Sequence, residues 1–520
     1  MMKNRLMWGI LLVAFSMIYE TGIGQVQWVK KDGKELYNEP YRPQWHFSPE
    51  KKWMNDPNGL VYYKGVYHLF YQYYPEDIVW GPMHWGHAVS QDLLHWEHKP
   101  VALYPDRHGY IFSGSAVVDT RNTSGLGSLE NPPMIAIFTY HDPKGEKEGR
   151  NDYQTQGMAY SLDHGDSWTK YMGNPIIKND GFKDFRDPKV FWNDKSDKWT
   201  MLLVAGDHLQ IWLSDNLIDW KKVSEFGRDQ GAHGGVWECP DMFKLQVEGS
   251  KEEKWVLLIS INPGAPNGGS GTQYFIGDFD GETFSSDQEE NRWIDWGMDD
   301  YAGVTYNNTP DNKRIFIGWM SNWLYGQQAP TKKWRSAMTV PRILSLKKIG
   351  DTLSLMNYPI SQFNAIVENG IPKNITIDKK EKTQVGFDNF NQAQVTFTTD
   401  AKDFQLVFKN GLGEHLDLTM DDHKKLFFLD RSQSGTTDFE KDFASKEQQM
   451  PIGNLPSGPL EVRILLDRSS VEIFIDKGQY VMTAQIFPNE NYDTLSIENR
   501  SDRTINLRNF VVDGIHGVWR

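Results

Sequence analysis

The sequence is poor in cysteine and in basic residues. Cys239 is the only cysteine among 520 residues, and 55 Lys and Arg face 69 Asp and Glu, for a formal net charge of −14. One thiol cannot form an internal disulfide, so the fold must be held together by packing. An acidic balance argues against binding to nucleic acid or to anionic lipid. We therefore predict no nucleic-acid partner, and the sequence assigns no oligomeric state.

Long apolar runs are also scarce. The apolar residues 8–19 follow the positively charged Lys3 and Arg5 and precede the small residues of segment 22–24. This run is too short to span a bilayer and is typical of a secretory signal peptide. No cysteine follows it that could carry a lipid. We interpret residues 1–24 as a signal peptide and predict a soluble, periplasmic or secreted protein without a membrane anchor.

Amphipathic helical periodicity is nearly absent after a polar lead-in over residues 25–44. From 45 to 345 the chain alternates short apolar strands with Gly, Asn and Asp turns, a pattern typical of all-β proteins. Residues 346–365 resemble a linker. The remainder, 366–520, contains about seven further alternating strands, which predicts an antiparallel β-sandwich.

A repeated unit organises the region 45–345. Asp56-Pro57, Asp187-Pro188 and Glu238-Cys239-Pro240 each introduce a strand, a turn and a second strand. A single Asp-Pro normally marks a turn, but its recurrence indicates a repeat. Asp299 and the segment 113–116 introduce two more such units. We predict a five-bladed β-propeller, whose innermost strands would bring the acids together at the axis.

Three converging acids in an aromatic-rich chain suggest hydrolysis of glycosidic bonds, which uses one ionised and one protonated carboxyl group. Asp56 lies beside Asn55 and the N–H groups of a turn, an environment that favours the ionised form. The charge of Arg186 would keep Asp187 ionised as well. Glu238 has apolar neighbours in the sequence, which favour its protonated form.

Five ordered motifs make the region from about 45 to 515 resemble family 32 of the glycoside hydrolases, the invertases, inulinases and levanases that act on β-fructofuranosides. The motifs are Trp53-Met54-Asn55-Asp56-Pro57-Asn58-Gly59, Phe112-Ser113-Gly114-Ser115, Arg186-Asp187-Pro188, Glu238-Cys239-Pro240 and Ser469-Ser470-Val471-Glu472-Ile473-Phe474.

This resemblance implies a five-bladed propeller followed by a β-sandwich, and a mechanism that retains configuration. By motif, Asp56 would be the nucleophile, Glu238 the general acid/base, and Asp187 a stabiliser of the transition state. The residues that the resemblance places in contact with the substrate are Asn55, Gln72, Trp80, Phe112, Ser113 and Arg186. On the sequence alone, Gln72 and Trp80 could equally be structural.

The fifth unit departs from the family pattern. The family usually has Asp-Phe-Tyr-Ala where this chain has Asp299-Asp300-Tyr301-Ala302, so we assign no role to these residues. We interpret the Glu472 motif as a sandwich strand rather than a sugar site. Arg335 could orient an acid of the fifth blade or tie that blade to the sandwich.

A group of four histidines, at positions 84, 87, 95 and 98, lacks an acid or cysteine that would complete a familiar metal-ligand spacing. We predict no metal and no cofactor.

The predicted function is exo-hydrolysis of terminal fructosyl units from levan or inulin, and from sucrose. Acids on inner propeller strands would lie at the bottom of a narrow funnel, which Trp80, Phe112 and Trp323 could close around one terminal ring. Endo-levanase or endo-inulinase activity remains an alternative, because a shorter loop on one side of the funnel would let a polysaccharide chain run through the site. Transfer of fructose to a sugar acceptor also remains open. A non-catalytic glycan-binding propeller would require a lost acid, and none is lost.

Overall fold

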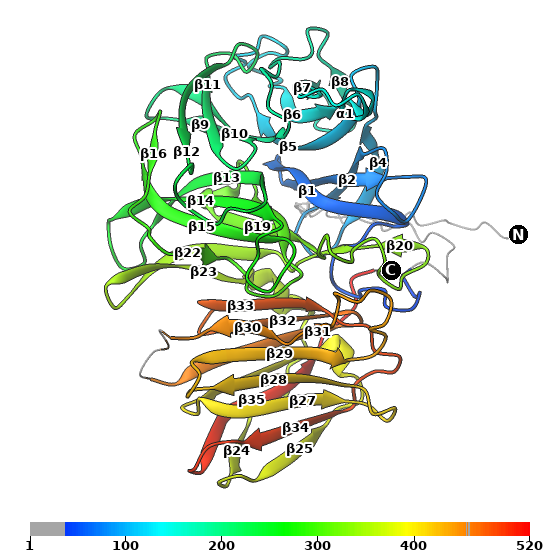
Figure 1. The fold of residues 1–520 in the computed structure, drawn as a ribbon, viewed down its shortest axis with the longest axis vertical. Coiled ribbons are helices and arrows are strands. Elements are labelled where there is room, and N and C mark those ends of the chain that lie inside the picture. Colours follow the sequence, from blue (N-terminus) through cyan, green and yellow to red (C-terminus); the bar gives the residue numbers. More distant parts are fainter. Residues whose placement is uncertain (1–36, 454, 456–457, 520) are drawn as a thin grey trace, which may run out of the picture.

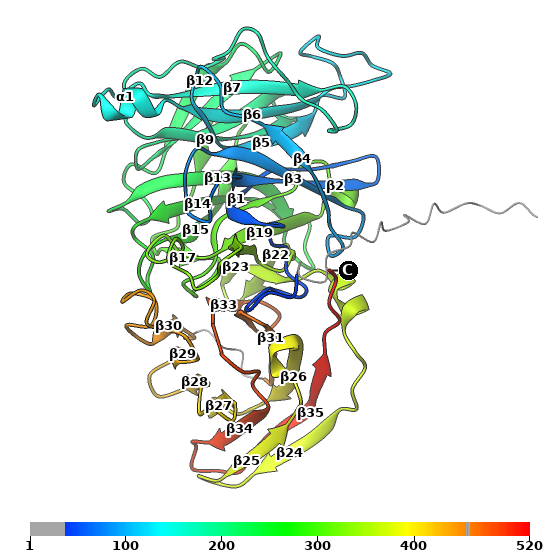
Figure 2. The ribbon, with the colours of Figure 1, turned by 90° about the vertical axis from the view of Figure 1, so that its right-hand side faces the viewer.

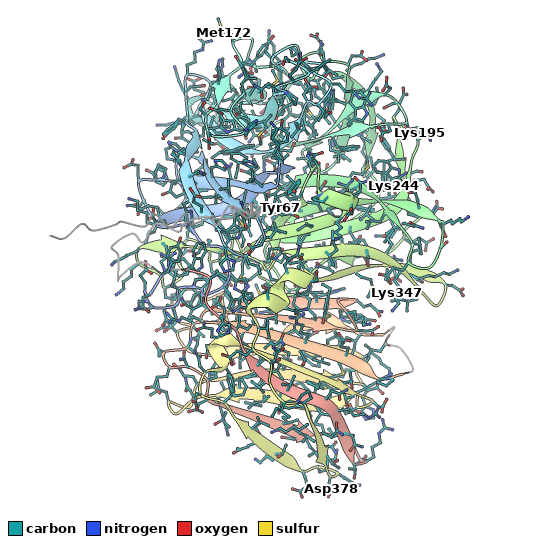
Figure 3. The ribbon with its side chains drawn as sticks, turned by 180° about the vertical axis from the view of Figure 1, so that it is seen from behind. Tyr67, Met172, Lys195, Lys244, Lys347 and Asp378 are labelled. Carbon is teal, nitrogen blue, oxygen red and sulfur yellow. The ribbon has the colours of Figure 1, made fainter. Side chains whose placement is uncertain are left out.

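The computed structural model describes residues 37–453, 455 and 458–519, so the predicted signal peptide lies outside the described residues. Strands dominate this part of the chain, which confirms the all-β prediction. A propeller lies above a β-sandwich in Figure 1. Met172 and Asp378 mark opposite ends of the long axis (Figure 3). None of the helices in the described ranges has the length and apolar character that crossing a membrane would require.

Five sheets of the described chain form the propeller blades, as predicted. The parallel pairing of β20 (Trp334–Arg335) with β1 (Lys52–Tyr63) joins the fifth-blade region to the first blade. The first blade contains β1 (Lys52–Tyr63), β2 (Val66–Tyr74), β3 (His84–Ser90) and β4 (Glu97–Leu103), and the second contains β5 (Tyr110–Val118), β6 (Met134–His141), β7 (Gln154–Ser161) and β8 (Thr169–Lys170). The third contains β9 (Phe185–Asn193), β10 (Lys198–Ala205), β11 (Leu209–Ser214) and β12 (Lys221–Phe226), and the fourth contains β13 (Val236–Gln246), β14 (Glu253–Asn262), β15 (Gly271–Phe279) and β16 (Phe284–Ser285) with β17 (Arg292–Trp293). The fifth contains β18 (Tyr301–Thr305), β19 (Arg314–Met320), β22 (Arg342–Ile349) and β23 (Thr352–Pro359) with β21 (Ala337–Met338).

The repeated acid and proline pattern has a structural cause that differs from a simple turn. Asp56, Asp187 and Glu238 lie inside the first strands of their blades, and the pairing of each of these strands with the next is interrupted by a register shift. Such a β-bulge leaves a residue unpaired and re-aims its side chain. Proline fits there because it has no N–H to contribute to the ladder. Comparable shifts interrupt β5 and β18, so all five inner strands bend at this point.

Trp96, Trp168 and Trp220 close the turns that follow the third strands of the first three blades. In each turn the indole N–H donates to the backbone carbonyl three residues earlier, at distances of 2.9–3.1 Å. Ser and Asp or Asn side chains cap the free backbone N–H groups of the same turns. These turns of the first three blades therefore share one structure.

The sandwich contains two six-stranded sheets in the described residues, more strands than the seven or so predicted. A buried apolar cluster fills the space between the sheets. One sheet has the order β24 (Lys373–Ile377), β35 (Ile505–Gly514), β26 (Ala393–Thr399), β31 (Leu460–Asp467), β32 (Ser470–Ile475) and β33 (Tyr480–Gln485). The other has the order β25 (Lys382–Gly386), β34 (Thr494–Asn499), β27 (Asp403–Lys409), β28 (His415–Asp421), β29 (Leu426–Gln433) and β30 (Gln448–Pro451).

The linker expected over 346–365 is wrong for most of its length. Residues up to Pro359 belong to β22 and β23, the outer strands of the fifth blade, and the short 3₁₀ helix η2 (Ser361–Ile366) leads to the sandwich. Leu346 and Leu355 are buried there against Phe243 and Phe316 of the fourth and fifth blades. The polar residues between these apolar positions face outward, which made the hairpin resemble a linker.

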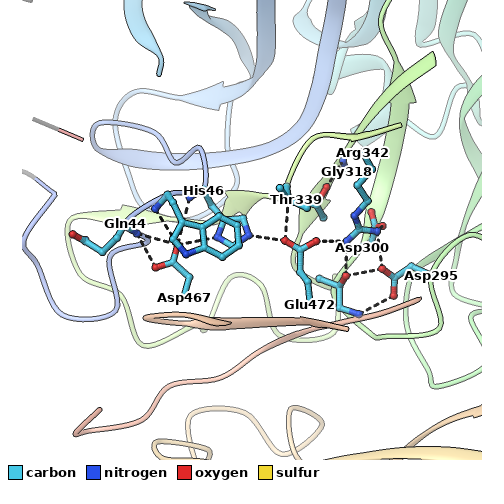
Figure 4. Close-up of polar contacts among 12 residues, drawn as sticks. Gln44, His46, Asp295, Asp300, Gly318, Thr339, Arg342, Asp467 and Glu472 are labelled. Atoms are coloured by element: carbon cyan, nitrogen blue, oxygen red, sulfur yellow. Dashed lines mark hydrogen bonds and ion pairs between the residues drawn. The ribbon is translucent and has the colours of Figure 1, made fainter. Parts of the chain in front are cut away.

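A buried charge network joins the propeller to the sandwich (Figure 4). Its centre is Arg342, which is fully buried and donates to the carboxylates of Asp295 and Asp300, at 3.0 Å each, and of Glu472. Glu472 also accepts a hydrogen bond from His46. The Glu472 motif therefore lies in a sandwich strand, as predicted, and Asp300 belongs to the domain interface.

His46 lies between two carboxylates, with Asp467 2.9 Å from Nδ1 and Glu472 2.6 Å from Nε2. Burial acts to lower the pKa of His46, but the hydrogen bonds to these carboxylates outweigh burial and raise it. Burial likewise opposes ionisation of Glu472, yet Arg342 and His46 lower its pKa to about 2. The protonated imidazole is thus the form that the interface stabilises.

We predict that the protein loses stability as the pH rises above neutrality. A group whose pKa is higher in the folded than in the unfolded protein stabilises the folded state. This contribution is complete at pH values below the unfolded pKa, about 6.5 for histidine, and is lost as the pH rises through the folded pKa. Urea unfolding between pH 5.5 and 9 should show this decline. His46→Asn should flatten it, and an unchanged slope in that variant would contradict the assignment to His46.

Candidate active site

A cavity of about 250 Å³ opens at the end of the propeller axis where the inner strands carry their acids. Every site residue predicted from the sequence lines it, and so the structure brings together residues from all five blade regions. These residues are Asn55, Asp56, Gln72, Trp80, Phe112, Ser113, Arg186, Asp187, Glu238 and Trp323.

Asp56 lies in the bulge of β1, with a donor on each carboxylate oxygen. Ser113 Oγ donates to Oδ2 at 2.6 Å, and Asn55 Nδ2 donates to Oδ1 at 2.9 Å. Asn55 is itself oriented by the indole N–H of Trp53, 2.7 Å from its Oδ1. Burial raises the pKa of Asp56, while the two donors act against it. Its carboxylate is therefore fixed in position and weakly solvated.

Asp187 occupies a left-handed backbone conformation, with φ of 66°, in the bulge of β9. Its Oδ2 accepts the backbone N–H of Cys239 at 3.0 Å. Burial raises the pKa of Asp187 to about 7, in spite of the opposing charge of Arg186, and the nearby Glu238 and Asp56 add to the rise. The sequence expectation considered only the charge of Arg186, whereas burial of the carboxyl group is the larger effect on the pKa of Asp187.

Glu238 has polar partners rather than the apolar surroundings that its sequence neighbours suggested. Arg186 donates to Oε1 from Nε at 3.1 Å and from Nη2 at 2.9 Å. Tyr301 donates its hydroxyl to the other oxygen, Oε2. The apolar neighbour Trp237 does not surround the carboxyl group of Glu238, because its ring packs in a separate buried apolar cluster. Glu238 is thus oriented by one cation and one hydroxyl.

Aromatic side chains form the walls of the cavity. Trp80 meets Phe112 edge to face, with ring centroids 6.1 Å apart, and Phe112 stacks on His141 at 4.3 Å. Trp323 packs against Trp53, with centroids 6.0 Å apart. Flat apolar walls above polar groups are what a site needs to grip a sugar ring and orient its hydroxyls.

Arg335 neither orients an acid of the fifth blade nor ties that blade to the sandwich. Its guanidinium donates to the backbone carbonyls of Gln327, Ala329 and Thr331. The side chain of Gln327 in turn accepts the backbone N–H of Trp80 at 3.3 Å. Arg335 therefore fastens the loop that supports one wall of the cavity.

Several residues of the site were missed in the sequence. Tyr301 lies in the fifth-blade motif, and Cys239 lies within the repeat, with its thiol 3.6 Å from both Asp56 and Asp187. These two could have been found from their motifs. The others lie between the end of β6 and the start of β9 and carry no recognisable spacing: His141, Glu146, Tyr153, Gln154 and Asp184.

In the described part of the chain, no three His, Cys, Asp or Glu side chains are grouped so that they could hold a metal ion. The cavity contains three carboxyl groups in different surroundings. Asp56 has neutral donors, Glu238 has a cation and a hydroxyl, and Asp187 is the third. Such a set is suited to nucleophilic and acid–base steps on a small polar substrate.

Two family models match the chain, one described as "Glycosyl hydrolases family 32 N-terminal domain" over residues 46–359 and one as "Glycosyl hydrolases family 32 C terminal" over residues 364–512. A levanase of Bacillus subtilis (strain 168) is 44% identical over 494 residues, which cover 93% of this chain and 72% of the relative. An extracellular exo-inulinase of Aspergillus awamori is 43% identical and covers 88% of this chain and 91% of the relative.

Solved structures agree in fold. The crystal structure of the exo-inulinase from Aspergillus awamori superimposes with a TM-score of 0.85 at 39% identity, covering 93% of this chain and 100% of that one. A fructofuranosidase from Schwanniomyces occidentalis complexed with fructose gives a TM-score of 0.82 at 30% identity, covering 93% of this chain and 100% of that one.

Proposed function

Since the chain belongs to family 32 of the glycoside hydrolases, we propose that it releases terminal β-D-fructofuranosyl units from fructans such as levan or inulin, and from sucrose. The observation that carries this proposal is the shape of the site. Three carboxyl groups lie at the bottom of one aromatic-walled cavity of about 250 Å³, below the range of about 300–1,000 Å³ usual for drug-sized ligands. Such a cavity suits one sugar ring, and the names of the relatives point to fructosyl substrates.

In the first step, Asp56 attacks the anomeric carbon of the fructosyl unit and Glu238 protonates the departing oxygen. The fixed carboxylate of Asp56 supports the nucleophile role, because Ser113 and Asn55 hold both of its oxygens. Its partial desolvation also makes it a stronger nucleophile than a fully hydrated carboxylate. The product of this step is a covalent fructosyl-enzyme and a free leaving group.

In the second step, Glu238 acts as a base. It takes a proton from a water molecule, which attacks the anomeric carbon and releases Asp56. Arg186 and Tyr301 hold the two oxygens of Glu238, so the same carboxyl group stays in place for both proton transfers. Two inversions at one carbon give net retention of configuration.

This proposal is tested by the configuration of the first product. Sucrose hydrolysed in an NMR tube should release fructose that appears first as the β-furanose and then mutarotates. Immediate appearance of the α-furanose would indicate direct attack by water and would contradict the nucleophile role of Asp56.

We propose that Asp187 binds hydroxyl groups of the fructosyl ring and that these hydrogen bonds tighten as the ring approaches an oxocarbenium ion. Asp187→Asn should then lower kcat by about 10²–10³-fold with little change in KM, because the interaction lost is made mainly in the transition state. Initial rates over a range of sucrose concentrations measure both constants. A rise in KM alone would make Asp187 a ground-state binding residue.

We also infer that the chain is exported. The pattern of residues 1–24 is that of a signal peptide, and the similar inulinases of Aspergillus are named extracellular. Protein recovered outside the cytoplasm should begin after Gly24 when its N-terminus is sequenced. A mature protein that still begins at Met1 would contradict this.

A further inference from the structure

Glu146 is an acidic side chain of the cavity for which the proposed mechanism has no use. It lies on α1 (Pro143–Lys147), the short helix that follows β6 and projects from the edge of the propeller in Figure 2. Its side chain is 52% exposed, yet it lines the cavity. Asp142 steadies the helix, because it caps the N–H of Lys144 and pairs with Arg150 at 2.6 Å.

A line of hydrogen bonds fixes the direction of this carboxylate. Gln154 Oε1 accepts the backbone N–H of Phe185 at 2.8 Å, so its amide nitrogen faces Nδ1 of His141, 3.3 Å away. Nδ1 must then be the acceptor, which places the imidazole proton on Nε2. Nε2 lies 3.1 Å from Oε2 of Glu146 and donates to it.

The ring of His141 is also held in its plane. It is buried, and it stacks on Phe112 with an angle of 8° between the planes. Burial lowers the pKa of His141, in keeping with the neutral tautomer that the hydrogen bonds require. Glu146 is therefore positioned by a rigid neighbour, although it is half exposed to solvent.

The position of Glu146 in the cavity identifies what it faces. Asn55, Gln72 and Ser113 at the bottom are 2–4% exposed, so the fructosyl ring lies there, whereas Glu146 lies at the mouth. Gln154 also accepts from Arg186 at 3.3 Å, and Arg186 binds Glu238. Glu146 is therefore linked through His141, Gln154 and Arg186 to Glu238, the proposed acid for the leaving oxygen.

We propose that Glu146 binds hydroxyl groups of the sugar unit on the leaving side of the scissile bond, and that it thereby sets the preference for substrates whose leaving group is a sugar. A carboxylate accepts strong hydrogen bonds from neighbouring hydroxyls. His141 acts through Glu146 and is a positioning residue. This inference rests on the proposed function, since it requires a fructosyl unit at the bottom of the cavity.

The test compares leaving groups with and without hydroxyls. For the parent and each variant, kcat/KM is measured for sucrose, for inulin and for an aryl β-fructofuranoside. Glu146→Ala should lower the ratio of the sucrose value to the aryl value about tenfold, which is the usual effect of losing a hydrogen bond to a charged group. Most of the change should appear in KM. Glu146→Gln keeps an acceptor and should restore part of the ratio.

Glu148 provides the matched control. It is an exposed acid two residues away whose partner is Lys144 at 3.8 Å, and it does not line the cavity. Glu148→Ala should leave the ratio within about twofold. Equal ratios for Glu146→Ala and the parent, in proteins that hydrolyse the aryl substrate, would overturn the inference alone. A parent protein that hydrolyses none of the three substrates would overturn the proposed function and the inference with it.

Discussion

Asp56→Asn is expected to lower kcat by more than about 10⁴-fold on every fructosyl substrate, in a protein that stays folded. The amide cannot form the covalent fructosyl intermediate, so the two-step route is lost altogether. The change is nearly isosteric, and Ser113 Oγ can still donate to the amide oxygen. Removing one carboxylate from a buried group of three should not destabilise the propeller, because burial already disfavours its ionised form.

Rates and thermal unfolding, measured on the same preparation, separate chemistry from folding. Asp166→Asn is a suitable control, since Asp166 is an exposed acid in a turn of the second blade. We expect parent-like rates from that variant. Parent-like rates from Asp56→Asn would show that the nucleophile is another group.

The second large effect is expected on stability. Arg342→Ala should lower the free energy of unfolding by about 3–5 kcal/mol, because it leaves Asp295, Asp300 and Glu472 buried without their shared cation. This is a large part of the roughly 5–15 kcal/mol by which most proteins are stable. The contact of the guanidinium with the Phe474 ring would be lost as well.

Urea unfolding of the two proteins at pH 7 measures this difference. Arg508→Ala serves as the control, because Arg508 forms an ion pair with Asp400 in which both side chains are about half exposed. Surface pairs of this kind contribute only about 0–1 kcal/mol. A loss below about 1 kcal/mol for Arg342→Ala would mean that the network does not hold the two domains together.

The architecture could be predicted from the sequence because its repeat is local. Each blade begins with a strand that must bulge at the same point, and the bulge selects the acid and proline pairs that recur along the chain. The predicted site residues come from these bulges and from the loops beside them. They meet in one cavity because all five inner strands bend at the same level.

What could not be predicted depends on contacts between distant segments. The environment of Glu238 is set by Arg186 and Tyr301, which lie 52 and 63 residues away, and not by its neighbours in the chain. Burial of Asp187 by the surrounding blades likewise outweighs the adjacent Arg186. His141 ends β6 and Glu146 lies on the short helix α1 that follows, a segment without a recognisable motif, so no pattern in the sequence could have revealed them.

The boundary between the domains also depends on contacts that the local sequence does not reveal. The last hairpin of the propeller carries polar residues between its buried apolar positions, so its sequence resembles a linker, yet it completes the fifth blade. Asp300, whose place in the motif departs from the family pattern, has its partner Arg342 in that hairpin. An acid is tolerated at the buried position 300 because the folded hairpin places Arg342 beside it.

We expect the cavity to admit one terminal fructosyl unit at a time. Anion-exchange chromatography of the earliest products from levan and from inulin tests this expectation most directly. We predict that free fructose is the first product from both polymers and that no intermediate oligosaccharide accumulates. A series of fructo-oligosaccharides that appears before free fructose would show instead that the polymer passes through the site and is cut internally.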